Sequence, residues 1–154
     1  MTTLIVLGII VAVIFFVYMF ALRGEHYNPD EIEPRATLSV SEQNRYKKTA
    51  YDFANALAKE NYTEAFNLLD SNIESQWSPE KLGASYKKMI EYGEGAATNI
   101  EVIEIMNDWP DRKENDIGWA YVAIEGSDYA EAVTVIVSKE NGDYRIRDIE
   151  WGRP

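Results

Sequence analysis

Residues 129–151 have the sequence YAEAVTVIVSKENGDYRIRDIEW, and this stretch decides the predicted fold. Asn141-Gly142 lies between two β-rich runs and is the dipeptide most typical of a two-residue hairpin turn, because both positions need positive φ. Side chains alternate between the two faces of a strand. In the second run, strict alternation predicts one face with Tyr144, Ile146 and Asp148 and the opposite face with Arg145, Arg147, Ile149 and Trp151.

Two further strands are predicted on the N-terminal side of this hairpin. Residues 118–126, GWAYVAIEG, form a β-rich run that joins the hairpin through a turn at Gly126-Ser127-Asp128. Residues 100–105 alternate as a strand would and are apolar on much of both faces. The loop at residues 107–116, NDWPDRKEND, connects these two runs. The sequence therefore predicts a four-strand antiparallel meander.

Helices are predicted before the strands. Ser41 can cap a first helix that runs to about Lys59, and a short second helix follows Tyr62. Ser78-Pro79 combines an N-cap with proline at the first helical position, which predicts a third helix to about Tyr92. The apolar face of the first helix consists of Tyr46, Ala50, Phe53 and Leu57. This segregation of helices and strands indicates an α+β domain at residues 41–154, with three helices packed on a curved sheet.

The apolar run LIVLGIIVAVIFFVYMFAL, at residues 4–22, contains no charged residue. As a helix of about 19 residues it spans about 28 Å, close to the thickness of a bilayer core. A cleaved secretory signal would need basic residues before a shorter apolar run, and small residues at the cleavage site. The sequence has no basic residue before the run and no pair of small residues at the expected cleavage site. We therefore predict a transmembrane anchor at residues 1–23, followed by an extended, proline-containing tether at residues 24–40 that holds the only histidine, His26.

The basic residues near the anchor indicate its orientation. Arg23 and Arg35 follow the apolar run, and no basic residue precedes it. The positive-inside rule then favours a cytoplasmic domain over a periplasmic one. We expect a single-pass protein of a bacterial inner membrane.

One stripe of the predicted anchor carries small residues. Gly8 and Ala12 form a small-xxx-small pair, which lets a second helix approach closely, and Phe15 and Met19 lie on the same stripe. This pattern predicts helix packing within the membrane, with a lipid-facing stripe as the alternative.

Composition excludes several classes of function. The net charge is −11, and every charged side chain lies at or after Arg23, so the domain repels phosphate backbones and nucleic acid is not an expected partner. The chain has no cysteine, which excludes disulfides and Cys-ligated metal. The acidic loop at residues 107–116 lacks the residue order and the glycine of a calcium loop. We expect no cofactor and no metal.

The order and rhythm of these elements resemble the NTF2-like superfamily, whose fold is a cone-shaped α+β domain. The resemblance rests on YDFANALAKENYTEAFNLL (residues 51–69), on the SPEKL start of the third helix, and on the closing YRIRDIEWG. It covers about residues 41–152. It implies the fold rather than one activity, because the superfamily includes isomerases, dehydratases, small-molecule binders and non-catalytic partners of other proteins.

An enzyme of this family would place its acids, tyrosines or histidines inside the cone. The predicted domain has no histidine, so a His–Asp dehydratase arrangement is excluded. An isomerase-like site would need Glu131 or Asp148 as the base and Tyr121 or Tyr144 as the oxyanion donor. The alternative is that both acids lie on an exposed sheet surface and pair with arginines.

Two tryptophans are candidates for contact with a partner, because exposed aromatic residues are enriched in protein interfaces. They are Trp109 in the acidic loop and Trp151 near the C-terminus; the alternative is that each folds back over the mouth of the cone. With no catalytic signature, the leading hypothesis is a non-enzymatic, membrane-anchored accessory or assembly subunit of a larger membrane complex. A small apolar ligand binder or isomerase-like enzyme is the alternative, and a homodimer through the sheet is a third.

Overall fold

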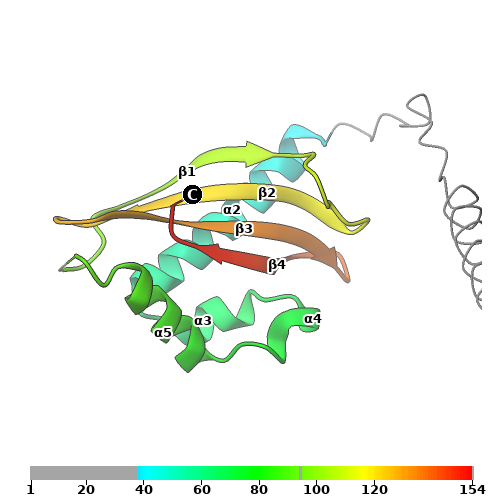
Figure 1. Cartoon of the computed structure of the whole chain (residues 1–154). Helices are drawn as coiled ribbons and strands as arrows, with labels where there is room; N and C mark the ends of the chain where they lie inside the picture. Colours follow the sequence, from blue (N-terminus) through cyan, green and yellow to red (C-terminus); the bar gives the residue numbers. More distant parts are fainter. Residues whose placement is uncertain (1–37, 94, 154) are drawn as a thin grey trace, which may run out of the picture. The chain divides into compact units, whose positions relative to one another are not determined.

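The computed structural model describes residues 38–93 and 95–153; the predicted anchor, with Gly8, Ala12, Phe15 and Met19, and most of the predicted tether lie outside the described residues. Four strands follow the described helices and form one antiparallel sheet in the order β1-β2-β3-β4 (Figure 1). This confirms the α+β class and the four-strand meander. The elements are α2 (Val40–Ala58), α3 (Tyr62–Asn67), α4 (Ser71–Glu74), α5 (Pro79–Met89), β1 (Asn99–Met106), β2 (Asp116–Glu125), β3 (Ala130–Glu140) and β4 (Asp143–Trp151).

No helix among the described residues is long and apolar enough to cross a bilayer.

Helix α2 begins two residues earlier than the sequence suggested. The Ser39 hydroxyl accepts the Glu42 backbone N–H, and the Glu42 carboxylate accepts the Ser39 backbone N–H at 3.1 Å, so the two residues form a capping box. Ser41 cannot form such a box, because the residue three positions after it is Asn44 rather than an acid. Ser39 and Val40 therefore belong to the helix and not to the tether.

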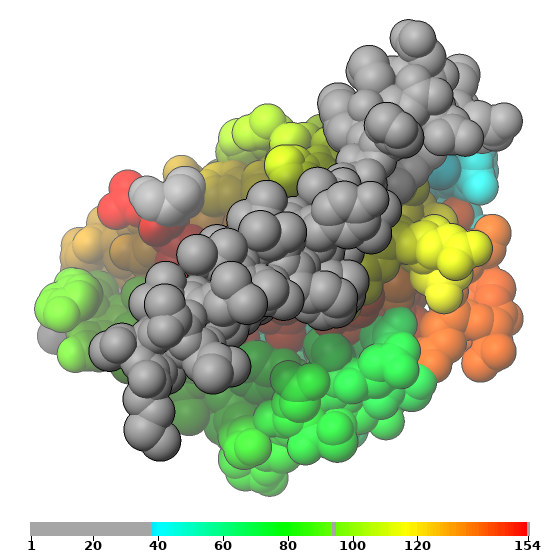
Figure 2. Space-filling model, turned by 45° about the vertical axis from the view of Figure 1, so that its right-hand side comes forward, coloured from blue at the N-terminus to red at the C-terminus, as the bar shows by residue number. Residues whose placement is uncertain are grey.

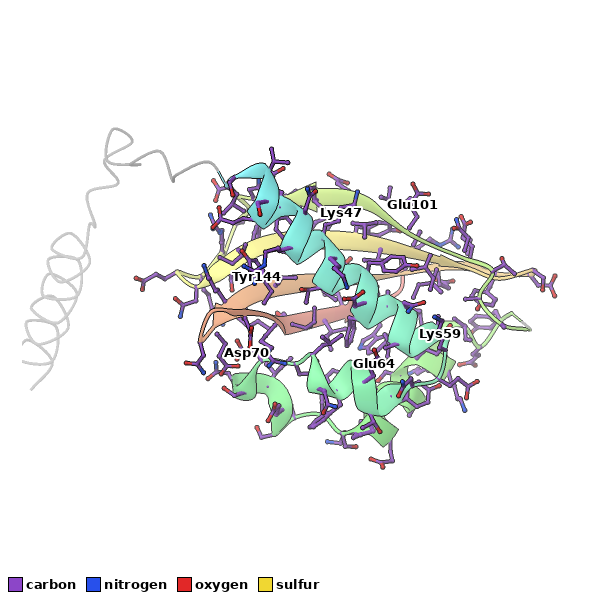
Figure 3. The ribbon with its side chains drawn as sticks, turned by 180° about the vertical axis from the view of Figure 1, so that it is seen from behind. Lys47, Lys59, Glu64, Asp70, Glu101 and Tyr144 are labelled. Atoms are coloured by element: carbon purple, nitrogen blue, oxygen red, sulfur yellow. The ribbon has the colours of Figure 1, made fainter. Side chains whose placement is uncertain are left out.

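Helix α2 lies across one face of the sheet (Figures 1 and 3). Its predicted apolar face is confirmed, because the side chains of Tyr46, Ala50, Phe53 and Leu57 are all fully buried. They pack against the inward side chains of the strands, among them Val122 and Val135. Gly118 allows the closest approach: a Cβ at this position would lie 2.5 Å from the ring of the buried Tyr46.

The other three helices of the described residues, α3, α4 and α5, lie beyond the edge strand β4 (Figure 1). Leu69 forms a parallel bridge with Ile146, which ties the end of α3 to that edge. Helix α5 begins after Ser78, whose side chain accepts the Lys81 N–H, with Pro79 as its first residue, as predicted. The short helix α4 was not predicted; its N-cap is Asp70, which accepts the backbone N–H of Asn72.

The side-chain alternation predicted for the last strand is wrong. A β-bulge shifts the β3–β4 register between Ile136 and Val137, so that Ile146 pairs with Val137 and Asp148 pairs with Ile136. Arg147 is the extra residue. A bulge places two residues opposite one and reverses the alternation beyond it. As a result, Ile146 and Ile149 are both buried on the helix side, whereas Asp148 is exposed.

Candidate protein interface

The sheet face opposite α2 is crossed by no helix of the described part of the chain (Figure 1). In β2, alternate residues are fully buried under α2, and the residues between them, including Trp119 and Tyr121, are only half-buried. Antiparallel sheets often pack one face on the core and expose the other, but an exposed face is then normally polar. This face carries aromatic side chains among its polar ones.

The strand register aligns these side chains into two rows across all four strands. In one row Glu104, Tyr121, Thr134 and Glu150 pair in succession from β1 to β4. In the neighbouring row the successive partners are Met106, Trp119, Ile136 and Asp148. Side chains paired in this way across a sheet lie about 5 Å apart on the same face. Each row therefore has an apolar or aromatic centre and a carboxylate on β4, and the first row has a second carboxylate on β1.

The aromatic centre is compact. The rings of Trp119 and Tyr121 stack with centroids 6.4 Å apart and an interplanar angle of 18°. Ile103, the extra residue of a second bulge on β1, lies beside them and leaves 57% of its surface exposed. Exposed apolar side chains are unremarkable when scattered, but a contiguous group on an uncovered face indicates a contact surface.

Two adjoining depressions lie over these rows. One, of about 300 Å³, lies between the two rows and the loop that carries Trp109. The other, of about 470 Å³, extends past Ile103 toward the C-terminal end of β4. Both are lined by Trp119, Thr134 and Glu150, so they adjoin one another on this face. We call the two depressions together the open-face trough, with Trp119, Tyr121, Thr134 and Ile136 as its floor and Glu104 and Glu150 as its two borders.

A buried ion pair holds one end of the trough. The Arg147 guanidinium donates to both carboxylate oxygens of Asp116, at 2.5 and 2.9 Å, and the Asp116 side chain is fully buried. Asp116 also accepts the backbone N–H of Lys113, and Arg112 donates to the Asp116 carbonyl oxygen. The bulge on β4 aims Arg147 at this site. Together these bonds fix the loop at residues 107–116, and with it Trp109, over the sheet.

A second polar cluster joins α4 to the β3–β4 hairpin. The buried Asp70 accepts hydrogen bonds from the Ser138 hydroxyl at 2.6 Å and from both amide groups of Asn72. Burial acts to raise the pKa of Asp70, but these hydrogen bonds, together with the nearby Arg147, outweigh it and hold the pKa below its ordinary value. Ser71 also donates to Glu140, and the green surface of α4 meets the orange surface of the hairpin in Figure 2.

This second cluster borders a hollow of about 780 Å³, which is lined mainly by polar and charged side chains. Three of its four acidic side chains are already engaged, Asp70 with Ser138, Asp116 with Arg147, and Glu140 with Ser71; the fourth, Glu114, is exposed. Within the described residues, no group of three His, Cys, Asp or Glu side chains could hold a metal ion. The cluster acts as a structural clamp.

The two predicted contact tryptophans differ in their surroundings. Trp109 is half-buried, borders the open-face trough, and has the Arg112 guanidinium 5.6 Å from its ring centroid. Trp151 instead packs against Trp77, with ring centroids 5.9 Å apart, and its indole nitrogen is buried. Trp109 therefore lies beside the open-face trough and is partly exposed, whereas the ring of Trp151 is part of the packing between β4 and the helices.

The four residues of the alternative cavity do not converge. Tyr121 and Asp148 lie on the open face, in neighbouring rows. Tyr144 is buried on the helix side beneath Arg45, whose guanidinium lies 4.5 Å from its ring. Glu131 lies near the opposite end of β3 and contacts Arg153 at 3.8 Å. Tyr144 on β4 pairs with Lys139 on β3. Lys139 is eight residues from Glu131 on that strand, or about 26 Å at 3.3 Å per residue, so Tyr144 and Glu131 lie far apart.

A comparison of the chain with protein-family models finds no match, and comparisons with curated proteins and with solved structures find none either.

From the sequence, Trp109 was a contact candidate and Tyr121 only an alternative oxyanion donor inside the cone, and Trp119 was not singled out as either. The alternation in GWAYVAIEG does show that Trp119 and Tyr121 share one face. It does not show which face the helix covers, because small residues at Gly118 and Ala120 fit close helix packing and an open surface equally well. The borders Glu104 and Glu150 were missed because they become opposite one another only through the register of four strands.

Proposed function

We propose that this protein is a non-enzymatic, membrane-anchored accessory or assembly subunit, and that its domain acts by binding another protein of a larger membrane complex. The observation that carries the proposal is the open-face trough, an aromatic surface on a sheet face that no described helix covers. Burial of apolar surface of this kind against a partner is favourable, because it removes the surface from water.

The packing on the helix side supports contact rather than catalysis. The space between α2 and the sheet is filled by large side chains, including the fully buried Tyr46, Phe53 and Leu57. The Tyr144 hydroxyl is buried there without a hydrogen-bond partner among the described residues. A ligand-binding or isomerase-like cone would need an apolar cavity with convergent polar groups at this place. The fold we propose is an NTF2-like cone whose interior is plugged by aromatic side chains.

The apolar run at residues 4–22 supports the membrane part of the proposal. Its length matches a bilayer core, and it would keep the domain close to the membrane through a short tether. Gly8 and Ala12, with Phe15 and Met19, would let the anchor pack against a helix of the same complex. We propose the cytoplasmic side of a bacterial inner membrane for the domain, because the only nearby bases, Arg23 and Arg35, follow the run.

Purification from native membranes in mild detergent tests this proposal. We expect the full chain to elute with a second, different subunit in constant ratio, at a mass larger than that of the chain alone. The complex should persist in an α2 variant, Lys47→Ala, which changes an exposed side chain on the helix face away from the trough (Figure 3). A monomer without a constant companion would refute the proposal.

A further inference from the structure

We propose that the open-face trough binds an amphipathic α-helix of a partner protein whose apolar stripe is flanked by Lys or Arg on both sides. This inference rests on the proposed function, because it names the kind of surface that the accessory domain would recognise. It is carried by three properties of the trough: its width, its apolar floor and the charge of its two borders.

The width of the trough fits one helix. Glu104 and Glu150 lie on the first and last strands of the sheet, three strand spacings apart. At about 4.8 Å per spacing, their backbones are about 14 Å apart. An α-helix with its side chains is about 10–12 Å wide. A single helix lying along the strands therefore fits between the two borders.

The floor of the trough fits the apolar stripe of such a helix. Trp119 and Tyr121 contribute stacked rings, and Thr134 and Ile136 continue the floor on β3. Trp119 and Tyr121 are two residues apart on β2, about 7 Å at 3.3 Å per residue, which matches a little more than one helical turn. Trp and Tyr are the side chains most often found to carry binding energy in protein interfaces.

The borders select for positive charge. Glu104 and Glu150 have no hydrogen bond or ion pair with any other described residue. The Asp148 side chain lies on the same side as Glu150 and is 59% exposed, and it is 4.0 Å from the Arg147 guanidinium. The nearby bases are largely engaged, since Arg147 pairs with Asp116 and Arg153 contacts Glu131. Lys113, in the loop at one end of the trough, is the exception. Lys or Arg on both flanks of a bound helix would meet these carboxylates.

The same charges disfavour a second copy of this chain as the occupant. Two such faces placed against each other would bring an acidic border onto an acidic border, and like charges across an interface cost free energy. They also disfavour an anionic membrane surface. The experiment must also detect two other occupants of the trough: a second copy of the chain in a face-to-face homodimer, and residues 1–37 of the same chain.

The test uses the full chain in nanodiscs of neutral phosphatidylcholine, with empty nanodiscs subtracted. The probe is an 18-residue synthetic helix with a leucine stripe flanked by lysines, labelled for anisotropy and carrying a photo-crosslinker on the stripe. The matched control peptide has glutamates in place of the lysines. We expect saturable binding of the lysine peptide, at least tenfold weaker binding of the glutamate peptide, and crosslinks at residues 117–123 and 132–136.

Two sets of variants locate the binding energy. Glu104→Gln/Glu150→Gln removes both borders without breaking a described contact and should weaken binding of the lysine peptide about three- to tenfold. Trp119→Ser should weaken it at least tenfold. The matched control Glu91→Gln/Asp128→Asn makes the same change in net charge at exposed sites away from the trough and should alter binding less than twofold.

Several results would overturn the inference. In the binding measurements, they are equal affinity for the two peptides, or an affinity of the Glu104→Gln/Glu150→Gln variant for the lysine peptide that equals that of wild type. In the crosslinking measurements, they are crosslinks outside the trough, or crosslinks that join the trough to residues 1–37 or to a second copy of the chain. These failures differ from failure of the proposed function. A lone monomer from native membranes refutes the accessory role, whereas a native complex that survives Glu104→Gln/Glu150→Gln unchanged refutes only the helix-binding assignment.

Discussion

Replacing Arg147 by methionine tests whether the buried ion pair holds the loop at residues 107–116 on the sheet. In the wild-type protein, the guanidinium donates to both oxygens of Asp116, and the two side chains are only 14% and 0% exposed. Methionine keeps an apolar stem of similar length but removes every donor. Asp116 would then remain buried as a charge, with the Lys113 backbone N–H as its remaining donor to the carboxylate.

The expected loss of stability is large. Removing one partner of a buried ion pair costs about 3–5 kcal/mol, because the other charge is left uncompensated. An estimate from Coulomb's law agrees: two unit charges at 4 Å interact by about 4 kcal/mol at an effective dielectric constant of 20. A domain of this size has about 5–15 kcal/mol of total stability. With a urea dependence of about 1.5–2 kcal/mol per molar, the unfolding midpoint should fall by about 1.5–3 M.

Urea titration of the full chain in mild detergent, followed by tryptophan fluorescence, measures this shift. Arg153→Met is the matched control: its partner Glu131 is 3.8 Å away and the Arg153 side chain is 60% exposed, so the loss should stay below about 1 kcal/mol. In the double variant Asp116→Asn/Arg147→Met no charge stays buried, so more than half of the lost stability should return. An Arg147→Met midpoint within 0.5 M of wild type, or a double variant no more stable than the single one, would refute this reasoning.

Three further predictions concern the start of α2, the contact between α2 and the sheet, and the polar cluster around Asp70 that joins α4 to the β3–β4 hairpin. Ser39→Ala should destabilise the protein by about 1 kcal/mol by removing the capping box, whereas Ser41→Ala should stay within about 0.5 kcal/mol; equal effects would contradict the observed cap. Gly118→Ala should cost about 1–3 kcal/mol in urea unfolding, because the added methyl meets the buried ring of Tyr46, and an unchanged midpoint would contradict that contact. Because the pKa of Asp70 is lower in the folded state than its ordinary value of 3.8, its charge stabilises the fold fully above about pH 5 and loses this effect as the pH falls through 3.8 and then through the folded-state pKa. The stability advantage of wild type over Asp70→Asn should therefore shrink on acidification, and an advantage that grew below pH 4 would refute the assignment.

Features that depend on a few neighbouring residues could be predicted from the sequence. Ser78 followed by Pro79 predicted the start of α5, and Asn141-Gly142 predicted the β3–β4 turn, where both residues have positive φ. The start of α2 was misplaced because two serines compete there, and only Ser39 has an acid three residues later. The physics needed for that choice is local, so the sequence could have settled it.

The candidate interface was only partly predictable. Trp109 was predicted as a contact residue and Tyr121 only as a cavity residue of the alternative enzyme, whereas Trp119, Ile136 and the two acidic borders were not singled out. Their importance depends on which sheet face α2 covers and on how four strands align. Neither can be read from one strand, because a shift of one residue moves every side chain to the opposite face.

The sequence by itself therefore determined the order of helices and strands, the hairpin at residues 141–142 and the apolar face of α2. The periodicity of each segment decides these features through hydrogen bonds and burial that involve nearby residues. The tertiary structure alone decided the bulge at Arg147, its pairing with Asp116 and the alignment of Glu104 with Glu150. Those contacts join residues far apart in the chain, and their free energy is gained only when the strands have already paired in one register.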